Sequence, residues 1–149
     1  MEEKEIDVMK GNAGYKATID TLSNCKKRIL ARTFYEPHTL KERMGMDSYV
    51  AKKYGSKKIL RKIYKVVSPD TPTTRKTLAE RQKYAFQGNI RYIKQEKFSP
   101  VSMLVSDDIF WLGFIDKARS DRTYLKINSK ELSDAFEEIF NMLWEKAKE

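Results

Sequence analysis

Strand-like and helical segments follow one another in a definite order along this chain, and that order constrains the fold more than any other feature. Up to residue 88, segments with the two-residue alternation of β-strands take turns with segments of helical periodicity. Four strand-like segments then follow, and a helix ends the chain. Alternation is typical of parallel strands joined by right-handed crossovers, whereas consecutive strands favour antiparallel pairing. We expect an α/β fold with a mixed sheet, parallel in its first part and antiparallel in the hairpins after residue 88, flanked by helices.

The length and composition favour one domain. The chain has 149 residues and contains seven Phe, eight Tyr and two Trp, which supply a hydrophobic core. No repeat or Pro/Gly-rich linker divides it, so we expect a single domain over residues 1–149, with no separate DNA-binding domain. No apolar run reaches the roughly 20 residues of a membrane span, and the first ten residues lack the apolar core of a secretory signal. We expect a cytoplasmic protein that does not enter the membrane.

The numbers of cysteine and histidine exclude several kinds of site. A single Cys25 excludes an intramolecular disulfide and a Cys-based zinc site, and one histidine cannot form a His-rich metal site. We expect neither a metal nor a cofactor. The three cations after Cys25 would lower the pKa of its thiol if it were exposed, but an inert buried thiol is the simpler interpretation. Asp107–Asp108 could hold a metal, yet a hairpin turn explains both residues.

Positive charge is concentrated in one part of the chain. The formal net charge is +9, and residues 1–100 carry 23 basic against 11 acidic residues, whereas residues 101–149 carry 7 against 10. Within residues 51–65, cations alternate with Tyr54 and Tyr64, a pattern that can bind a nucleic-acid backbone and stack bases. The alternative is a solvated rim of a helix and a strand. The candidate nucleic-acid-binding residues are Lys52, Lys53, Lys57, Lys58, Arg61 and Lys62.

Polar residues follow two of the predicted parallel strands. Asp70, Thr71 and Thr74 lie where one strand leads into a helix that begins at Pro72, and free N–H groups there favour an anion. Capping of the helix by Thr71 would explain the same residues without a ligand. The preceding strand ends near Arg32, on what should be the same edge of the sheet. The predicted ligand pocket consists of Arg32, Tyr35, His38, Asp70, Thr71, Thr74 and Arg75.

The sequence offers little support for catalysis. It contains no dinucleotide-binding, P-loop or nucleophile-elbow motif. His38 is the one imidazole available as a base, and a loop histidine beside the ligand pocket is the simpler interpretation. We expect a protein that is not an enzyme.

The final helix is strongly amphipathic, and Asn128 with Glu131 resembles a capping box at its start. Its opposite face is polar. Packing on the chain's own sheet is the simplest use of the apolar stripe, and contact with a partner is the alternative. The stripe consists of Leu132, Phe136, Ile139, Phe140, Leu143, Trp144 and Ala147.

Three short motifs resemble the C-terminal sensor domain of TrmB-like transcriptional regulators, together with the order of elements over nearly the whole chain. They are Pro69–Asp70–Thr71–Pro72, Lys97–Phe98–Ser99–Pro100, and the helix residues Phe136, Phe140, Trp144 and Glu145. The resemblance implies one half of a phospholipase D-like fold, effector sensing and a homodimer. Phospholipase D enzymes need His-x-Lys-x4-Asp, but His38 is followed by Thr39 and Leu40, with Lys41 one position late. We also expect the chain to lack the winged helix-turn-helix domain of these regulators.

Two functions follow as expectations. The first is a non-enzymatic, effector-sensing and dimerising regulatory domain whose pocket takes a small anionic molecule. The second is a stand-alone nucleic-acid-binding protein that uses the basic face of residues 26–65. Nucleic acid could also be reached through a separate DNA-binding partner.

Overall fold

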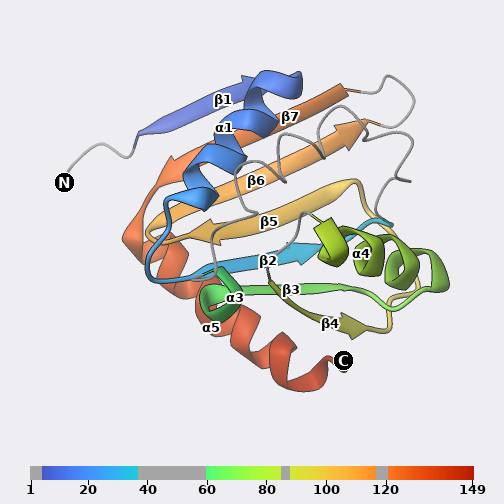
Figure 1. The fold of residues 1–149 in the computed structure, drawn as a ribbon. Coiled ribbons are helices and arrows are strands. Elements are labelled where there is room, and N and C mark those ends of the chain that lie inside the picture. Colours follow the sequence, from blue (N-terminus) through green and yellow to red (C-terminus); the bar gives the residue numbers. More distant parts are fainter. Residues whose placement is uncertain (1–4, 37–59, 85–87, 117–120) are drawn as a thin grey trace.

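The structure is a computed structural model that describes residues 5–36, 60–84, 88–116 and 121–149 (Figure 1). The strands are β1 (Ile6–Lys10), β2 (Ile29–Thr33), β3 (Tyr64–Pro69), β4 (Asn89–Ile93), β5 (Val101–Ser106), β6 (Ile109–Asp116) and β7 (Asp121–Asn128). The helices are α1 (Gly11–Ser23), the short α3 (Leu60–Ile63), α4 (Pro72–Tyr84) and α5 (Lys130–Lys146). Within these residues, no helix is long and apolar enough to cross a membrane.

The seven strands form one mixed sheet in the order β1-β7-β6-β5-β2-β3-β4. Strands β2, β3 and β4 are parallel, and every other neighbouring pair is antiparallel. Helices α1 and α4 lie on one face and α5 lies on the other (Figure 1). The predicted α/β fold with a mixed sheet between helices is therefore confirmed.

The first strand lies in an unexpected place. Strand–helix alternation predicts that β1 is parallel to β2, but β1 pairs antiparallel with β7 at the far edge of the sheet. Helix α1 packs on both β1 and β7. Gly14 permits this close packing, because a Cβ atom there would lie 2.7 Å from the Tyr124 ring.

Each face of the sheet has its own hydrophobic core. On the α1 face, Ile19 and Leu22 pack against Ile29, Ala31 and strand β3. On the α5 face, Phe136 and Phe140 pack against a cluster that includes Leu30, Val67, Val105 and Phe110. Consecutive residues of a strand point to opposite faces, so β2 contributes to both clusters.

Some of the predicted starts of helices and strands agree with the structure and others do not. Thr71 caps α4 as predicted, since its Oγ1 accepts a hydrogen bond from the Thr74 backbone N–H at 3.0 Å. Helix α5 is capped by Ser129 instead of Asn128, because the Ser129 hydroxyl accepts the Leu132 N–H at 3.1 Å. The predicted strand from Ile59 to Asp70 begins only at Tyr64, and residues 60–63 form α3. The helices predicted at residues 40–44 and 48–54 lie outside the described residues.

The hairpin predicted at Asp107–Asp108 joins β5 to β6. Asp107 has a positive φ of 52°. Its carboxylate accepts backbone N–H groups from residues 26–28, the shortest being Lys27 N–H to Oδ1 at 2.8 Å. Asp107 therefore ties the hairpin to the segment before β2 and already satisfies those amides.

Candidate functional site

The parallel strands β2, β3 and β4 all end at one edge of the sheet, where α/β folds commonly bind ligands. The Thr33 and Ser68 hydroxyls form a hydrogen bond of 2.8 Å on the α1 face. Ser102 lies opposite Thr33 in the register, Gly113 opposite Ser102, and Tyr124 opposite Gly113. A row of small and hydroxyl-bearing residues thus crosses five strands. We call these five residues (Ser68, Thr33, Ser102, Gly113 and Tyr124) the polar row.

Tyr35 belongs to the same part of the molecule. Burial, with smaller contributions from Tyr35 and Tyr15, outweighs the opposing effect of Arg122 and raises the pKa of Tyr124 to about 12. The Tyr15 and Tyr124 ring centroids are 6.5 Å apart. Tyr35 therefore lies at the end of the polar row with two other tyrosines, which the sequence motifs did not indicate.

Arg32 is on the other face of the sheet. Its guanidinium donates to Gln95 Oε1 at 2.8 Å and to the Thr33 carbonyl, and it lies 4.3 Å from the Phe34 ring centroid. The residue is 6% exposed, and burial lowers its pKa. No carboxylate of the described residues pairs with it, and its Nε has no hydrogen-bond partner. A buried cation without a counter-charge is costly, so this group is the clearest anomaly at the strand ends.

The polar side chains at the start of α4 form hydrogen bonds and an ion pair with one another. Thr71 donates its hydroxyl hydrogen to Thr74 Oγ1 at 2.9 Å, and Thr74 is fully buried. Arg75 donates to Asp70 at 2.6 Å and stacks 4.1 Å from the Tyr92 ring centroid. The hydrogen bond from Arg75 lowers the pKa of Asp70. Capping and ion pairing therefore account for these side chains without a ligand.

The structure brings together only some of the residues of the predicted ligand pocket. The Thr71–Thr74 pair and the Asp70–Arg75 pair lie at the start of α4, and Tyr35 lies by Tyr124 at the polar row. Arg32 points to the α5 face, and His38 lies outside the described residues. The two-residue alternation of β2 could have shown that Arg32 and Thr33 point to opposite faces.

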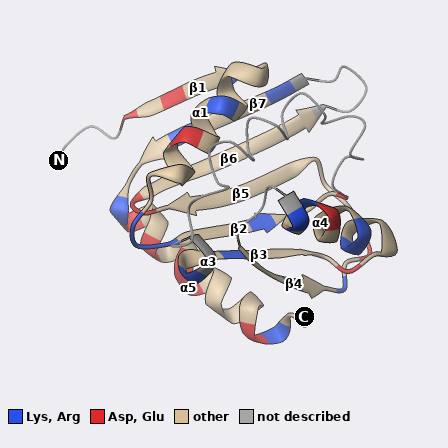
Figure 2. Cartoon of the chain, in the orientation of Figure 1, with Lys and Arg blue, Asp and Glu red and all other residues tan. Residues whose placement is uncertain are grey.

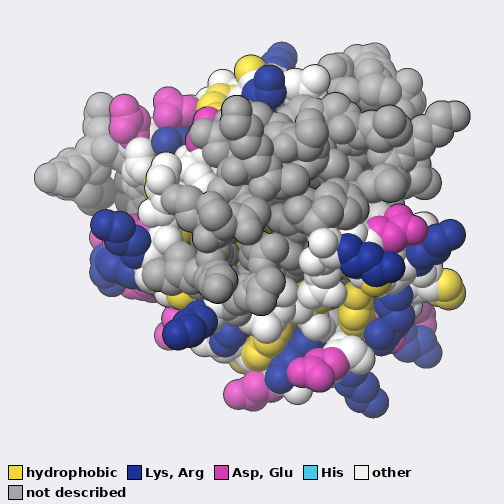
Figure 3. Space-filling model, in the orientation of Figure 1, with side chains coloured by type: hydrophobic (Ala, Val, Ile, Leu, Met, Phe, Trp, Pro, Cys, Tyr) yellow, Lys and Arg dark blue, Asp and Glu magenta, His cyan; other side chains and the backbone are white. Residues whose placement is uncertain are grey.

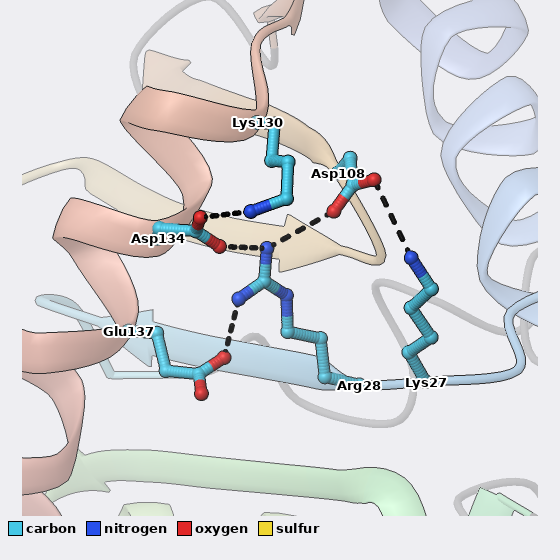
Figure 4. A pocket seen from close by; sticks show the side chains of 6 residues that line it. All are labelled: Lys27, Arg28, Asp108, Lys130, Asp134 and Glu137. Atoms are coloured by element: carbon cyan, nitrogen blue, oxygen red, sulfur yellow. Dashed lines mark hydrogen bonds and ion pairs between the residues drawn. The ribbon is translucent and has the colours of Figure 1, made fainter.

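Six charged residues surround an open hollow of about 350 Å³ at the opposite edge of the sheet (Figure 4). Arg28 is its centre: its guanidinium donates to Asp108 at 3.2 Å, pairs with Asp134 at 2.9 Å and donates to Glu137. Its Nε donates to the Asp107 carbonyl at 2.7 Å. Burial alone would lower the pKa of Arg28, but its hydrogen bonds to Glu137 and Asp134 outweigh this effect and raise the pKa. The hollow's lining residues are Lys27, Arg28, Asp108, Lys130, Asp134 and Glu137.

The charges around this hollow balance, since three cations face three carboxylates that are joined by ion pairs (Figure 4). This network connects the segment before β2, the β5–β6 hairpin and α5. We assign it to stability and not to ligand binding. No group of three metal-binding side chains occurs in the described part of the chain.

Cys25 is buried beside the same hairpin. Burial, with a smaller contribution from Asp107, raises the pKa of its thiol to about 12. Cys25 is therefore buried, as the simpler interpretation predicts.

Positive charge is concentrated at one end of the sheet, around β3, β4 and α4. Residues 60–97 contain ten Lys and Arg against three Asp and Glu. Figure 2 shows these charges along α4 and its neighbouring strands, and Figure 3 shows cationic side chains around α4 on this face. The exposed lysines of this region, which we call the basic end, are Lys62, Lys76, Lys83, Lys94 and Lys97.

Most of the nucleic-acid-binding residues predicted from the sequence are not in the described ranges. Lys52, Lys53, Lys57 and Lys58 lie outside them, and the side chain of Arg61 is not described either. Lys62 is exposed in α3, two residues before β3. The basic end extends beyond the predicted basic stretch of residues 26–65, into α4 and the segment after β4.

Comparison with solved structures identifies the fold. NucT from Helicobacter pylori matches with a TM-score of 0.65 at 12% identity, over 98% of this chain and 99% of NucT. Nuc from Salmonella typhimurium, a phospholipase D family member, matches with a TM-score of 0.62 at 14% identity, over 98% and 97% of the two chains. The chain has the phospholipase D-like fold.

The archaeal chromatin protein TrmBL2 shares this phospholipase D-like fold, and its structure is described as showing a novel mode of DNA binding. The match has a TM-score of 0.58 at 19% identity and covers 96% of this chain. The chain spans 53% of the TrmBL2 chain, about half its length. No family model matches the sequence. A search of curated proteins finds no match either.

Proposed function

We propose that this chain is a non-enzymatic regulatory domain, related to TrmB-like regulators, that binds DNA through the basic end. The proposal rests mainly on the charge of residues 60–97. This segment contains ten basic and three acidic residues, and it lies at one end of the sheet. Lysines that face solvent attract the phosphate backbone and release its counterions on binding. The shared fold with TrmBL2, a DNA-binding chromatin protein, supports the same proposal.

The geometry of α4 suits phosphate contact. Lys76 and Lys83 are both exposed and lie seven residues apart, so they project from one side of the helix about 10 Å apart along its axis. Lys94 and Lys97 follow β4 and are also exposed. The basic end provides phosphate contacts without a predicted base-reading helix, so we expect binding with little sequence preference.

The absence of the catalytic motif supports a function other than phosphodiester hydrolysis. The one histidine is His38, and the positions two and seven residues later hold Leu40 and Gly45 in place of Lys and Asp. Asp107 is preceded by Ser102 and Pro100 at the matching positions. Neither stretch of the sequence therefore contains the histidine nucleophile together with the lysine and the aspartate that the motif requires.

The proposal is tested by two double variants with the same change of charge. Lys76→Glu with Lys83→Glu alters the basic end, whereas Lys26→Glu with Lys27→Glu alters exposed lysines at the opposite edge of the sheet. We expect the first pair to weaken binding to a short random-sequence DNA duplex by about 100-fold at low salt and the second pair by less than about threefold. Fluorescence anisotropy with the labelled duplex measures both affinities.

Two results would count against DNA binding at the basic end. Equal losses in the two variants would show that only total charge matters, and no binding of wild-type protein at low salt would remove DNA binding altogether. Thermal unfolding of each variant controls for the fold, since exposed lysines contribute little to stability.

A second candidate function, the sensing of a small anionic effector, rests on the buried Arg32. Its guanidinium lacks a carboxylate partner among the described residues, and an anion held beside it would supply the missing counter-charge. Gln95, which already binds Arg32, would orient such a ligand from the loop after β4.

A thermal-shift experiment tests effector binding with inorganic phosphate, a sugar phosphate and a dicarboxylate as probes. We expect at least one probe to raise the Tm of the wild type and to leave Arg32→Gln unchanged, because a ligand stabilises the state that binds it. Arg75→Ala is the control at an exposed arginine and should keep the response. If no probe shifts the wild type, or if the Arg32→Gln protein responds equally, Arg32 does not bind an effector of these classes.

A further inference from the structure

The α5 face of the sheet is covered by a helix over only part of its area. Helix α5 packs on β2, β4, β5 and β6, whereas β1 and β7 are packed mainly by α1 on the other face (Figure 1). On the α5 side, Ile6 and Val8 of β1 are 59% and 60% exposed, and Phe114 of β6 is 41% exposed. The register places Val8 opposite Leu125 and Leu125 opposite Leu112, so the apolar surface is continuous across three strands. We call these five residues (Ile6, Val8, Leu112, Phe114 and Leu125) the open sheet face.

The open sheet face has the width of one helix. Adjacent strands of a sheet lie about 4.8 Å apart, so the distance from β1 across β7 to β6 is about 10 Å. An α-helix with its side chains has a diameter of about 10 Å. A sheet normally buries its apolar face against another layer, and one further helix beside α5 would complete that layer here.

Helix α5 carries a second apolar surface that its own sheet does not bury. Leu132, Ile139 and Met142 are 38%, 58% and 63% exposed, and Ala135 is exposed as well. Successive members are three, four and three residues apart, which is the spacing of the apolar seam between two packed helices. We call Leu132, Ala135, Ile139 and Met142 the outer stripe.

The outer stripe is directed toward the open sheet face. On the other side of α5, Asp134 and Glu137 bind Arg28 beside the hairpin at which β6 begins. The side of α5 that carries the outer stripe therefore points along β6, away from this hairpin and toward Phe114. A helix placed beside α5 would contact the outer stripe with one side and the open sheet face with another.

A row of glutamates runs along the solvent side of the outer stripe. Glu131, Glu138 and Glu145 are exposed and seven residues apart, so they lie on one line along α5, about two turns from one to the next. Glu131 also accepts a hydrogen bond from the Ser129 hydroxyl at the start of the helix. Charges beside the apolar seam of a helix pair select the partner, and glutamate selects lysine or arginine. We call these three glutamates the acidic row.

We propose that the open sheet face and the outer stripe together bind one amphipathic helix of a partner protein, and that this helix carries basic residues beside its apolar side. Its apolar side packs on both surfaces, and its lysines or arginines, repeated every seven residues, pair with the acidic row. The chain has a net charge of +9, so it repels a basic peptide in general. Binding of a basic helix must therefore come from this local surface, which shares no residue with the basic end.

Fluorescence anisotropy with a labelled, designed helical peptide as long as α5 tests both surfaces. The peptide carries leucine and isoleucine along one side and lysine at every seventh position beside them. We expect Ile139→Glu with Met142→Glu, and separately Val8→Glu, to raise its dissociation constant about 30-fold or more. Thr73→Glu with Ala79→Glu, at exposed positions of α4, is the control and should leave binding unchanged. No binding to the wild type up to about 0.5 mM peptide, or an equal loss in the control, would overturn the proposal.

A reversal of charge tests the acidic row separately. We expect the wild type to bind a second peptide, with glutamate in place of each lysine, about tenfold more weakly than the lysine peptide. Glu138→Lys with Glu145→Lys should invert this preference. Asp7→Lys with Glu96→Lys makes the same change of charge at exposed positions elsewhere and should keep it. If the first variant kept the wild-type preference, the acidic row would not select the partner.

Sedimentation velocity distinguishes a partner helix from a second copy of the chain as the occupant of this surface. We expect the lysine peptide to bind without changing the number of chains in each particle. A wild-type dimer that both the peptide and Ile139→Glu with Met142→Glu dissociate would overturn the proposal, because a second copy would then occupy the surface.

Discussion

Replacing Phe140 with alanine is expected to lower the free energy of unfolding by about 3–5 kcal/mol. Phe140 is fully buried in the centre of α5 and packs between Phe136 and Trp144, with ring centroids 6.1 and 5.9 Å away. The substitution leaves a cavity that the rigid sheet beneath cannot fill. Urea unfolding followed by circular dichroism measures the loss, because α5 dominates the packing of this face of the sheet.

Asn141→Ala is the matched control for Phe140, because Asn141 is the next residue of α5 and faces solvent. We expect this substitution to change stability by less than about 0.5 kcal/mol. A loss for Phe140→Ala of similar size to the control would show that α5 is not anchored to the sheet as described. The assignment of α5 as the cover of β2 and β5 would then be wrong.

Replacing Arg28 with alanine is expected to cost about 2–4 kcal/mol of stability. Its side chain is only 16% exposed and binds groups from two places in the chain, the β5–β6 hairpin and α5. The substitution removes the cation and leaves three carboxylates close together. Lys27→Ala is the control, since Lys27 is 68% exposed and contacts Asp108 at 3.6 Å. A surface pair of this kind contributes at most about 1 kcal/mol.

The dependence of unfolding on pH gives the Arg28 variant a second measurement. Hydrogen bonds from Lys130 first, and then from Arg28, lower the pKa of Asp134. A carboxyl whose pKa is lowered by folding contributes stability above its unfolded pKa of about 3.9, and this contribution is lost as the pH falls through the folded value. Arg28→Ala should therefore reduce the loss of stability below about pH 4. If the variant lost as much stability below about pH 4 as the wild type does, the proposed interaction of Arg28 with Asp134 would be contradicted.

The parts of the fold that were predicted correctly depend on neighbours in sequence. Thr71 before Pro72 marks a helix start, and Asp107–Asp108 between two apolar runs marks a hairpin, because capping and turn formation need only a few residues. The position of β1 was not predictable in this way. Its pairing with β7 joins segments more than 100 residues apart, and the alternation of strands and helices contains no information about that contact.

The candidate sites also divide into features that neighbouring residues in the sequence predict and features that depend on distant residues. The strand-end residues were recognised because they follow apolar runs, but their partners were not, since Gln95 reaches Arg32 from a distant loop. The Arg28 network was missed because its carboxylates come from residues 108, 134 and 137. The helical spacing of Ile139 suggested a buried residue, whereas the crossing of α5 over the sheet leaves it 58% exposed.

The affinity for a DNA duplex as a function of salt concentration tests the central claim most directly. If the basic end contacts phosphates, the logarithm of the binding constant should fall linearly with the logarithm of salt concentration, by about one unit of slope for each contact. Lys76→Ala with Lys83→Ala should then reduce the slope by about two units, whereas Lys26→Ala with Lys27→Ala should leave it unchanged. A slope that does not change in the Lys76 and Lys83 variant would contradict the assignment of DNA binding to the basic end.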